Sequence, residues 1–91
     1  MRFDWDPEKA ASNLKKHGVS FEEAVSVFAD PLALYSDDPH HPERTRVIGA
    51  SARRRVLFCV FVERDEDEVR IISARKVTAH ERRRYEEGTE A

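Results

Sequence analysis

Arg75 and Lys76 end an apolar run that begins at Val69, and their types and position suit phosphate chemistry. A strand that ends in two cations holds fixed positive charge where a phosphate group can bind. The guanidinium of Arg75 stays charged and offers a planar fork to two phosphate oxygens. The alternative is an ordinary solvated or salt-bridged arginine. The pattern predicts a phosphate-binding position at this strand end.

Other residues that could transfer protons or bind phosphate are scattered along the chain. Glu43 and Arg44 are adjacent, so they form either an activating pair or a surface ion pair. Lys16 and His17 close the first predicted helix, where the helix dipole favours a cation without any function. Tyr85 can donate a proton or stack on a base, but it can equally pin the last helix to the sheet. Both kinds of role stay open for each residue.

Several other site chemistries lack the residues they need. His40 and His41 are adjacent, and neighbouring residues rarely chelate one ion well, so no metal site is predicted. The chain has no Gly-rich phosphate loop, no serine nucleophile elbow and no CxxC pair. We therefore expect neither a metal nor a cofactor.

Length and composition predict one ordered domain, residues 1–91, with a highly charged surface. The chain is 40% hydrophobic and 37% charged, and 16 Lys and Arg oppose 18 Asp and Glu. Nucleic acid would therefore have to meet a local cationic patch. The single cysteine, Cys59, cannot form an internal disulfide, and no segment has the length of a signal peptide core or a membrane span. We expect a cytoplasmic protein that does not contact membranes.

The sequence of the amino-terminal third predicts a short strand and two helices. A strand is expected over residues 2–5, followed by a helix that starts at Asp6 and Pro7 and ends at Gly18. Ala10, Leu14 and His17 are expected to form its buried face. A capping box of Ser20 and Glu23 starts the second helix, which Pro31 ends near residue 30.

The sequence pattern of the remaining chain predicts strands and a last helix. Four apolar runs of strand length read as consecutive antiparallel strands: LALY, TRVIGA, RVLFCVFVE and VRIISA. Residues 56–62 are apolar at every position, which is typical of a central strand covered on both faces. Thr78 caps a helix over residues 79–87. The predicted class is α+β, with a small antiparallel sheet of about four strands, two amino-terminal helices and one carboxyl-terminal helix.

The chain resembles the BrnT family of toxins from type II toxin–antitoxin pairs, which have a RelE-like fold. The motifs that carry the resemblance are FDWD at 3–6, NLKKHGVSFEEA at 13–24, DPLAL at 30–34, Glu43 and Arg44 with Ile48 and Gly49, RIISARK at 70–76, and ERRRYE at 81–86. Their joint order covers nearly the whole sequence. The resemblance implies a metal-independent ribonuclease that arrests growth.

The resemblance also implies partners and catalytic roles. The expected partners are an RNA substrate and a BrnA-type antitoxin that binds DNA, so that DNA is met only indirectly, with a dimer within the complex. Metal-free RNA cleavage needs a base, an acid and cations at the phosphate. We assign the catalytic roles to Arg75, Arg44, Glu43, His17 and Tyr85, and RNA binding to Lys16 and Lys76. The alternative is a non-enzymatic partner that tunes the antitoxin's repression of its operon.

Overall fold

The computed structural model describes residues 1–88, and its elements confirm the α+β class. In chain order they are β1 (Arg2–Asp4), α1 (Pro7–His17), α2 (Phe21–Ser26), the 3-10 helix η1 (Val27–Ala29), β2 (Leu34–Asp37), β3 (Thr45–Ala50), β4 (Val56–Arg64), β5 (Glu68–Lys76) and α3 (Ala79–Glu87). None of the helices within these described residues is long and apolar enough to cross a membrane.

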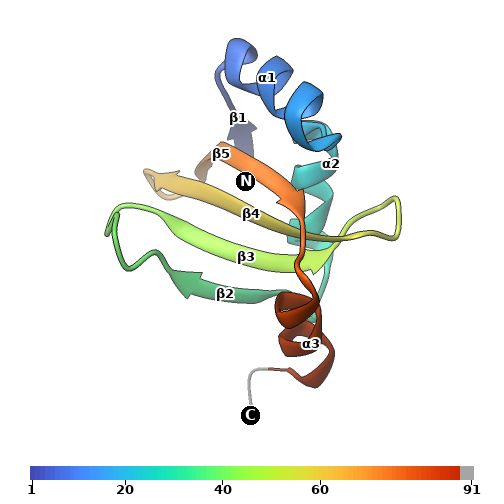
Figure 1. The fold of residues 1–91 in the computed structure, drawn as a ribbon. Coiled ribbons are helices and arrows are strands. Elements are labelled where there is room, and N and C mark those ends of the chain that lie inside the picture. The colour runs from blue at the N-terminus through green and yellow to red at the C-terminus, as the bar shows by residue number, and fades with distance from the viewer. Residues whose placement is uncertain (89–91) are drawn as a thin grey trace.

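The strands of residues 1–88 form a five-stranded sheet in the order β1-β5-β4-β3-β2 (Figure 1). Strands β2 to β5 pair antiparallel with their sequence neighbours, as predicted. β1 pairs parallel with β5, which places Phe3 opposite Val69. The sheet is therefore mixed and has one strand more than the predicted four. A strand of three residues is too short for its side-chain alternation to indicate a partner or a direction.

One face of the sheet is buried by α2 and η1, which lie behind it in Figure 1. Alternate residues of β4 point into this core: Leu57, Cys59 and Phe61 are at most 3% exposed. Gly49 of β3 lies directly under η1, because a Cβ atom there would come within 2.8 Å of the Val27 side chain. Glycine at this position lets η1 approach the sheet closely.

The other face, termed the open face, carries the remaining residues of β4. Val56, Phe58, Val60 and Val62 are half-buried. Among the described residues α3 approaches only one end of this face, so the prediction that β4 is covered on both faces is wrong. A continuous apolar run does not reveal which alternate residues point to solvent.

Helix α1 lies along β5 and is held there by a buried amide. The Asn13 side chain donates to the carbonyl oxygens of Val19 (2.9 Å) and Ala74 (2.8 Å), and its oxygen accepts from the Ala74 N–H (3.2 Å). β1 pairs with β5 only as far as Arg70. Asn13 therefore satisfies backbone groups further along β5 that no strand reaches. Asn13 is 8% exposed and Leu14 is 51% exposed, so the predicted burial of Leu14 is wrong.

The start of α2 is tied to the β3–β4 hairpin through Glu23. The Ser20 hydroxyl accepts from the Glu23 N–H at 3.0 Å, which is one half of the predicted capping box. The Glu23 carboxylate turns away to the hairpin, where it accepts from the Ser51 hydroxyl (2.7 Å) and from Arg55 Nε (3.0 Å) and Nη2. Glu23 is thus a buried, fully partnered anion.

Acid is expected to weaken the fold through Glu23. Hydrogen bonds from Arg55 hold the pKa of Glu23 below its ordinary value, although burial opposes them. The stabilisation is complete above the unfolded pKa and is lost as the pH falls through the lower folded pKa. Urea unfolding at about pH 7 and about pH 3 should show a larger loss of stability for the wild type than for Glu23→Gln. Equal losses would assign the acid sensitivity to other carboxylates.

Candidate active site on the open face

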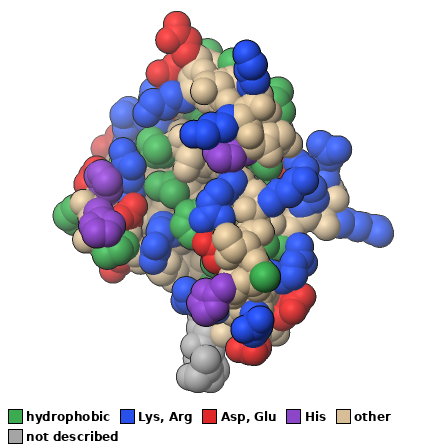
Figure 2. Space-filling view, in the orientation of Figure 1, with side chains coloured by type: hydrophobic (Ala, Val, Ile, Leu, Met, Phe, Trp, Pro, Cys, Tyr) green, Lys and Arg blue, Asp and Glu red, His purple; other side chains and the backbone are tan. Residues whose placement is uncertain are grey.

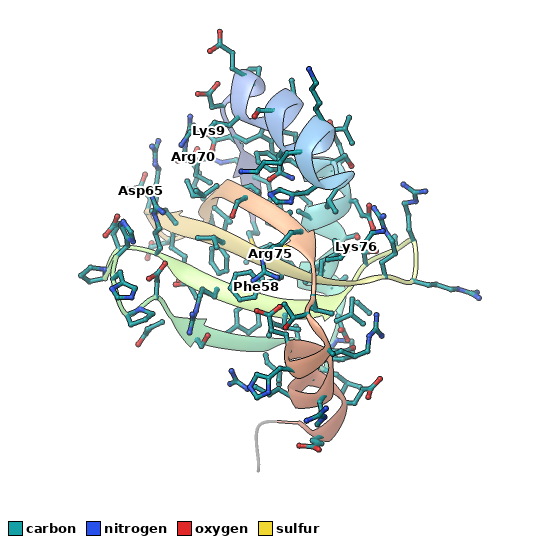
Figure 3. The ribbon with its side chains drawn as sticks, viewed as in Figure 1. Lys9, Phe58, Asp65, Arg70, Arg75 and Lys76 are labelled. Atoms are coloured by element: carbon teal, nitrogen blue, oxygen red, sulfur yellow. The ribbon has the colours of Figure 1, made fainter. Side chains whose placement is uncertain are left out.

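Arg75 points out of the open face above Phe58, its cross-strand partner on β4 (Figure 3). The central carbon of its guanidinium lies 4.2 Å from the centroid of the Phe58 ring, in cation–π contact. The two terminal nitrogens donate to the Glu81 carboxylate of α3 at 2.8 and 2.9 Å. Ring and carboxylate together hold the Arg75 guanidinium in one orientation.

The Arg75–Glu81 pair stays charged in the folded protein. Hydrogen bonds from Arg75 lower the pKa of Glu81, and hydrogen bonds to Glu81 raise the pKa of Arg75. Glu81 also closes a capping box, because its carboxylate accepts from the Thr78 N–H at 2.9 Å. An anion that binds Arg75 must therefore displace or share a carboxylate that belongs to the start of α3.

Arg46 of β3 brings a second guanidinium to the same place. It pairs with Val60, two residues along β4 from Phe58 on the same face, and its central guanidinium carbon lies 5.9 Å from the Phe58 ring centroid. Its Nε is buried and has no hydrogen-bond partner among the described residues. A buried N–H without an acceptor is costly. An anion bound beside Phe58 would supply that acceptor.

A small cleft, termed the α3 cleft, separates α3 from the open face. Its volume is about 140 Å³. This is below the roughly 300–1,000 Å³ of typical small-molecule pockets, so the cleft suits one small group such as a phosphate. Its lining is mainly cationic and apolar: Leu34, Tyr35, Ser36, Arg46, Ile48, Phe58, His80, Glu81 and Arg84.

Lys16 and His17 lie at the margin of the open face, beside β5. They line a shallow hollow with Ser73 of β5, which stands two residues before Arg75 on the same strand. Figure 2 shows Lys and Arg side chains gathered across this face from α1 to α3. The structure therefore brings Arg75, Lys16 and His17 to one cationic surface, although the chain as a whole carries a net charge of −2.

Glu43 and Arg44 lie at the other end of the sheet from Arg75. They precede β3, whose first residue pairs with Phe61, whereas Arg75 pairs with Phe58. Arg44 is thus roughly 13 Å along the strands from the Phe58 rung. Its Nε lies 3.8 Å from the Glu43 carboxylate, and both side chains are a third or more exposed. This geometry is typical of a surface ion pair.

Lys76 and Tyr85 also point away from the α3 cleft. Lys76 follows Arg75 on β5 and pairs with Leu57, so its side chain leaves the opposite face of the sheet. The Tyr85 hydroxyl donates to Asp30 at 2.6 Å, and this hydrogen bond, with burial, raises the pKa of Tyr85 to about 12. Tyr85 therefore pins α3 to the turn after η1, one of the two roles left open by the sequence.

Four residues of this site were not found from the sequence: Arg46, Phe58, His80 and Glu81. Phe58 stands in a continuous apolar run that hides its outward orientation. Arg46 could have been noticed as a charged residue at an alternate position of an otherwise apolar strand. Glu81 could have been noticed because it stands three residues after Thr78, the spacing of a capping box.

Within residues 1–88 no group of three or more His, Cys, Asp or Glu residues is placed to hold a metal ion.

The fold and the site together define a small α+β protein whose open sheet face carries fixed cations. A family model described as "Ribonuclease toxin, BrnT, of type II toxin-antitoxin system" matches residues 5–81, and the chain belongs to this family. The match confirms the resemblance carried by the sequence motifs. Toxins of this kind act with a protein antitoxin.

A solved structure supports the same fold. The crystal structure of the Brucella abortus ribonuclease toxin, BrnT, superposes with a TM-score of 0.72 and covers 86% of this chain and 97% of its own. The two chains share 21% sequence identity, so the likeness bears on the fold alone. No curated protein matches this sequence.

Proposed function

We propose that this chain is an endoribonuclease that cuts RNA on its open face without a metal ion. The observation that carries the proposal is the placement of Arg75, held over Phe58, beside Arg46, whose buried Nε has no partner among the described residues. Two guanidinium groups that both lie over the Phe58 ring can bind the oxygens of one phosphate. Fixed cations of this kind stabilise the charge that grows on a phosphorane. The family description supports the same activity.

The reaction needs a base and an acid at the same phosphate. The 2′-hydroxyl oxygen attacks the adjacent phosphorus, its proton passes to a base, the bond to the 5′-oxygen breaks, and an acid protonates that oxygen. The products are a 2′,3′-cyclic phosphate and a 5′-hydroxyl. Arg75 exchanges Glu81 for the phosphate, so Glu81 becomes free to act as the base. His80, which lines the α3 cleft, supplies the acid, and His17, at the margin of the open face beside β5, is the alternative.

The remaining predicted residues take positions around this centre. Lys16 contacts the RNA backbone beside β5. Arg44, with Glu43, and Lys76 lie outside the α3 cleft, where they can contact RNA further along its chain but not the reacting phosphate. Tyr85 supports catalysis by keeping α3 in place through Asp30. The catalytic roles assigned to Arg44, Glu43 and Tyr85 from the sequence stay predictions.

The partners follow from the family and from the charge. The antitoxin is of the BrnA type and binds operator DNA, and the complex holds two copies of this chain in the cytoplasm. A net charge of −2 supports contact with DNA only through the antitoxin.

The test is incubation of the purified chain with end-labelled single-stranded RNA in excess EDTA. Cleavage that leaves 2′,3′-cyclic phosphate ends is the expected result. Intact RNA in the presence of folded protein would overturn the enzyme proposal. Cleavage that EDTA abolishes and Mg²⁺ restores would overturn only its metal independence. If the chain leaves RNA intact and yet changes antitoxin binding to operator DNA in a mobility-shift assay, the non-enzymatic alternative is correct.

A further inference from the structure

A second hollow, termed the Phe28 groove, lies on the face of the sheet opposite Arg75. Its volume is about 410 Å³. Helix α2 and η1 cover only part of this face, and the groove occupies the end that they leave free. Its lining residues come from η1 and all five strands or their flanks: Met1, Phe28, Tyr35, Asp37, Thr45, Phe61, Glu63 and Val69.

The floor and wall of the groove are aromatic. The Phe28 ring centroid lies 4.9 Å from that of Phe61 and 6.3 Å from that of Tyr35, and Tyr35 meets Phe61 edge-on at 6.2 Å. The mutual contacts fix these rings. Tyr35 is nevertheless 50% exposed and Met1 is 75% exposed, so the groove offers apolar surface to solvent. Rigid aromatic surface of this kind is typical of positions where a partner inserts a large side chain.

The rim of the groove is mainly acidic. Asp37 and Glu63 are exposed on its edge, and the β4–β5 turn beyond Glu63 carries Asp65, Glu66 and Asp67 on the surface. The cations at this end include Arg2, which pairs with Glu68, Arg44, which directly precedes Thr45, and Arg64. Figure 3 places Asp65 at the far end of the sheet from Lys76. An occupant of the groove must therefore combine apolar and positively charged side chains.

We propose that the Phe28 groove is the docking site of the antitoxin, through a segment that carries one or two large apolar side chains flanked by Lys or Arg. A second copy of this chain fits less well, because a symmetric contact would bring the acidic rims together. The segment meets the face opposite Arg75 and Phe58, so apart from Tyr35, which borders both hollows, antitoxin affinity and RNA cleavage depend on different residues. The inference rests on membership of a toxin–antitoxin family and not on the cleavage mechanism.

The test measures the dissociation constant between this chain and the polypeptide encoded by the neighbouring gene, by titration calorimetry. Asp37→Lys and Glu63→Lys each place a cation against a cationic segment and are expected to weaken binding about 10- to 100-fold. Tyr35→Ala removes an exposed part of the aromatic wall and should weaken it about tenfold or more. Glu22→Lys on α2 and Leu14→Ala on α1 are matched controls outside the groove and should bind as the wild type does.

Each outcome bears on the proposal. Wild-type affinity in all three groove variants, with circular dichroism showing them folded, overturns it, and so does an equal loss in the two controls. Loss of self-association by Tyr35→Ala without any change in antitoxin affinity would assign the groove to a second copy and also overturn it. RNA cleavage by Asp37→Lys and Glu63→Lys should equal that of the wild type, because neither residue lines the α3 cleft. If even the wild type leaves RNA intact, the cleavage proposal fails while the groove result still stands.

Discussion

Replacement of Arg75 by alanine is expected to lower the rate of RNA cleavage about 10²- to 10³-fold, the usual effect of removing one fixed donor to a developing anion. Arg75 is half-buried, lies 4.2 Å from the Phe58 ring centroid and has both terminal nitrogens oriented by Glu81. Alanine leaves Arg46 as the remaining guanidinium over the Phe58 ring. The loss should appear in single-turnover rates at saturating protein, which separate the chemical step from RNA binding.

Two further variants separate the charge of Arg75 from its geometry and from its support of α3. Arg75→Lys keeps the charge but loses the planar fork, so its rate should lie between those of the wild type and the alanine variant. Arg83→Ala removes an exposed cation of α3 and should cleave at the wild-type rate. Thermal unfolding shows whether loss of the Glu81 contact destabilises the fold. A folded Arg75→Ala protein that cleaves RNA as fast as the wild type would refute the assignment of the site.

Local signals along the chain were sufficient to predict most of the fold. Asp6 and Pro7 start α1, Gly18 ends it in the left-handed conformation with φ 70°, and Thr78 starts α3, as expected. These signals act between residues close in sequence, so a single sequence is enough to recognise them. The burial of Asn13 in place of Leu14 depends on the backbone of β5, 61 residues away, which the periodicity of α1 does not record.

The candidate site was predicted only in part, because it depends on register between strands. Arg75 is recognisable from its own strand, since it follows an apolar run. Arg44 and Arg46 stand two residues apart, and only the pairing of β3 with β4 places Arg46 near Phe58 and Arg44 at the far end. Register is fixed by the whole sheet and its buried face. Arg46 is therefore recognised as the second cation of the site only from the structure, and not from a sequence motif.

Asn13→Ala is expected to destabilise the fold by about 2 to 4 kcal/mol, because it leaves the Val19 and Ala74 carbonyl oxygens and the Ala74 N–H without their buried partner. Domains of this size are stable by only about 5 to 15 kcal/mol, so the loss is a large fraction of the total. The melting temperature should fall by roughly 10 °C or more. Urea unfolding of the two proteins measures the difference directly.

The neighbouring residue provides the matched control, because Leu14 is larger and more apolar than Asn13 yet half exposed. Leu14→Ala should cost less than about 1 kcal/mol, the reverse of the order that hydrophobicity alone predicts. Asn13→Asp keeps the volume but replaces the donor by a carboxylate facing two carbonyl oxygens, so it should destabilise at least as much as alanine. Equal stability of the wild type and Asn13→Asp would mean that the side chain acts by filling space. The hydrogen bonds that join α1 to β5 would then contribute little to the fold.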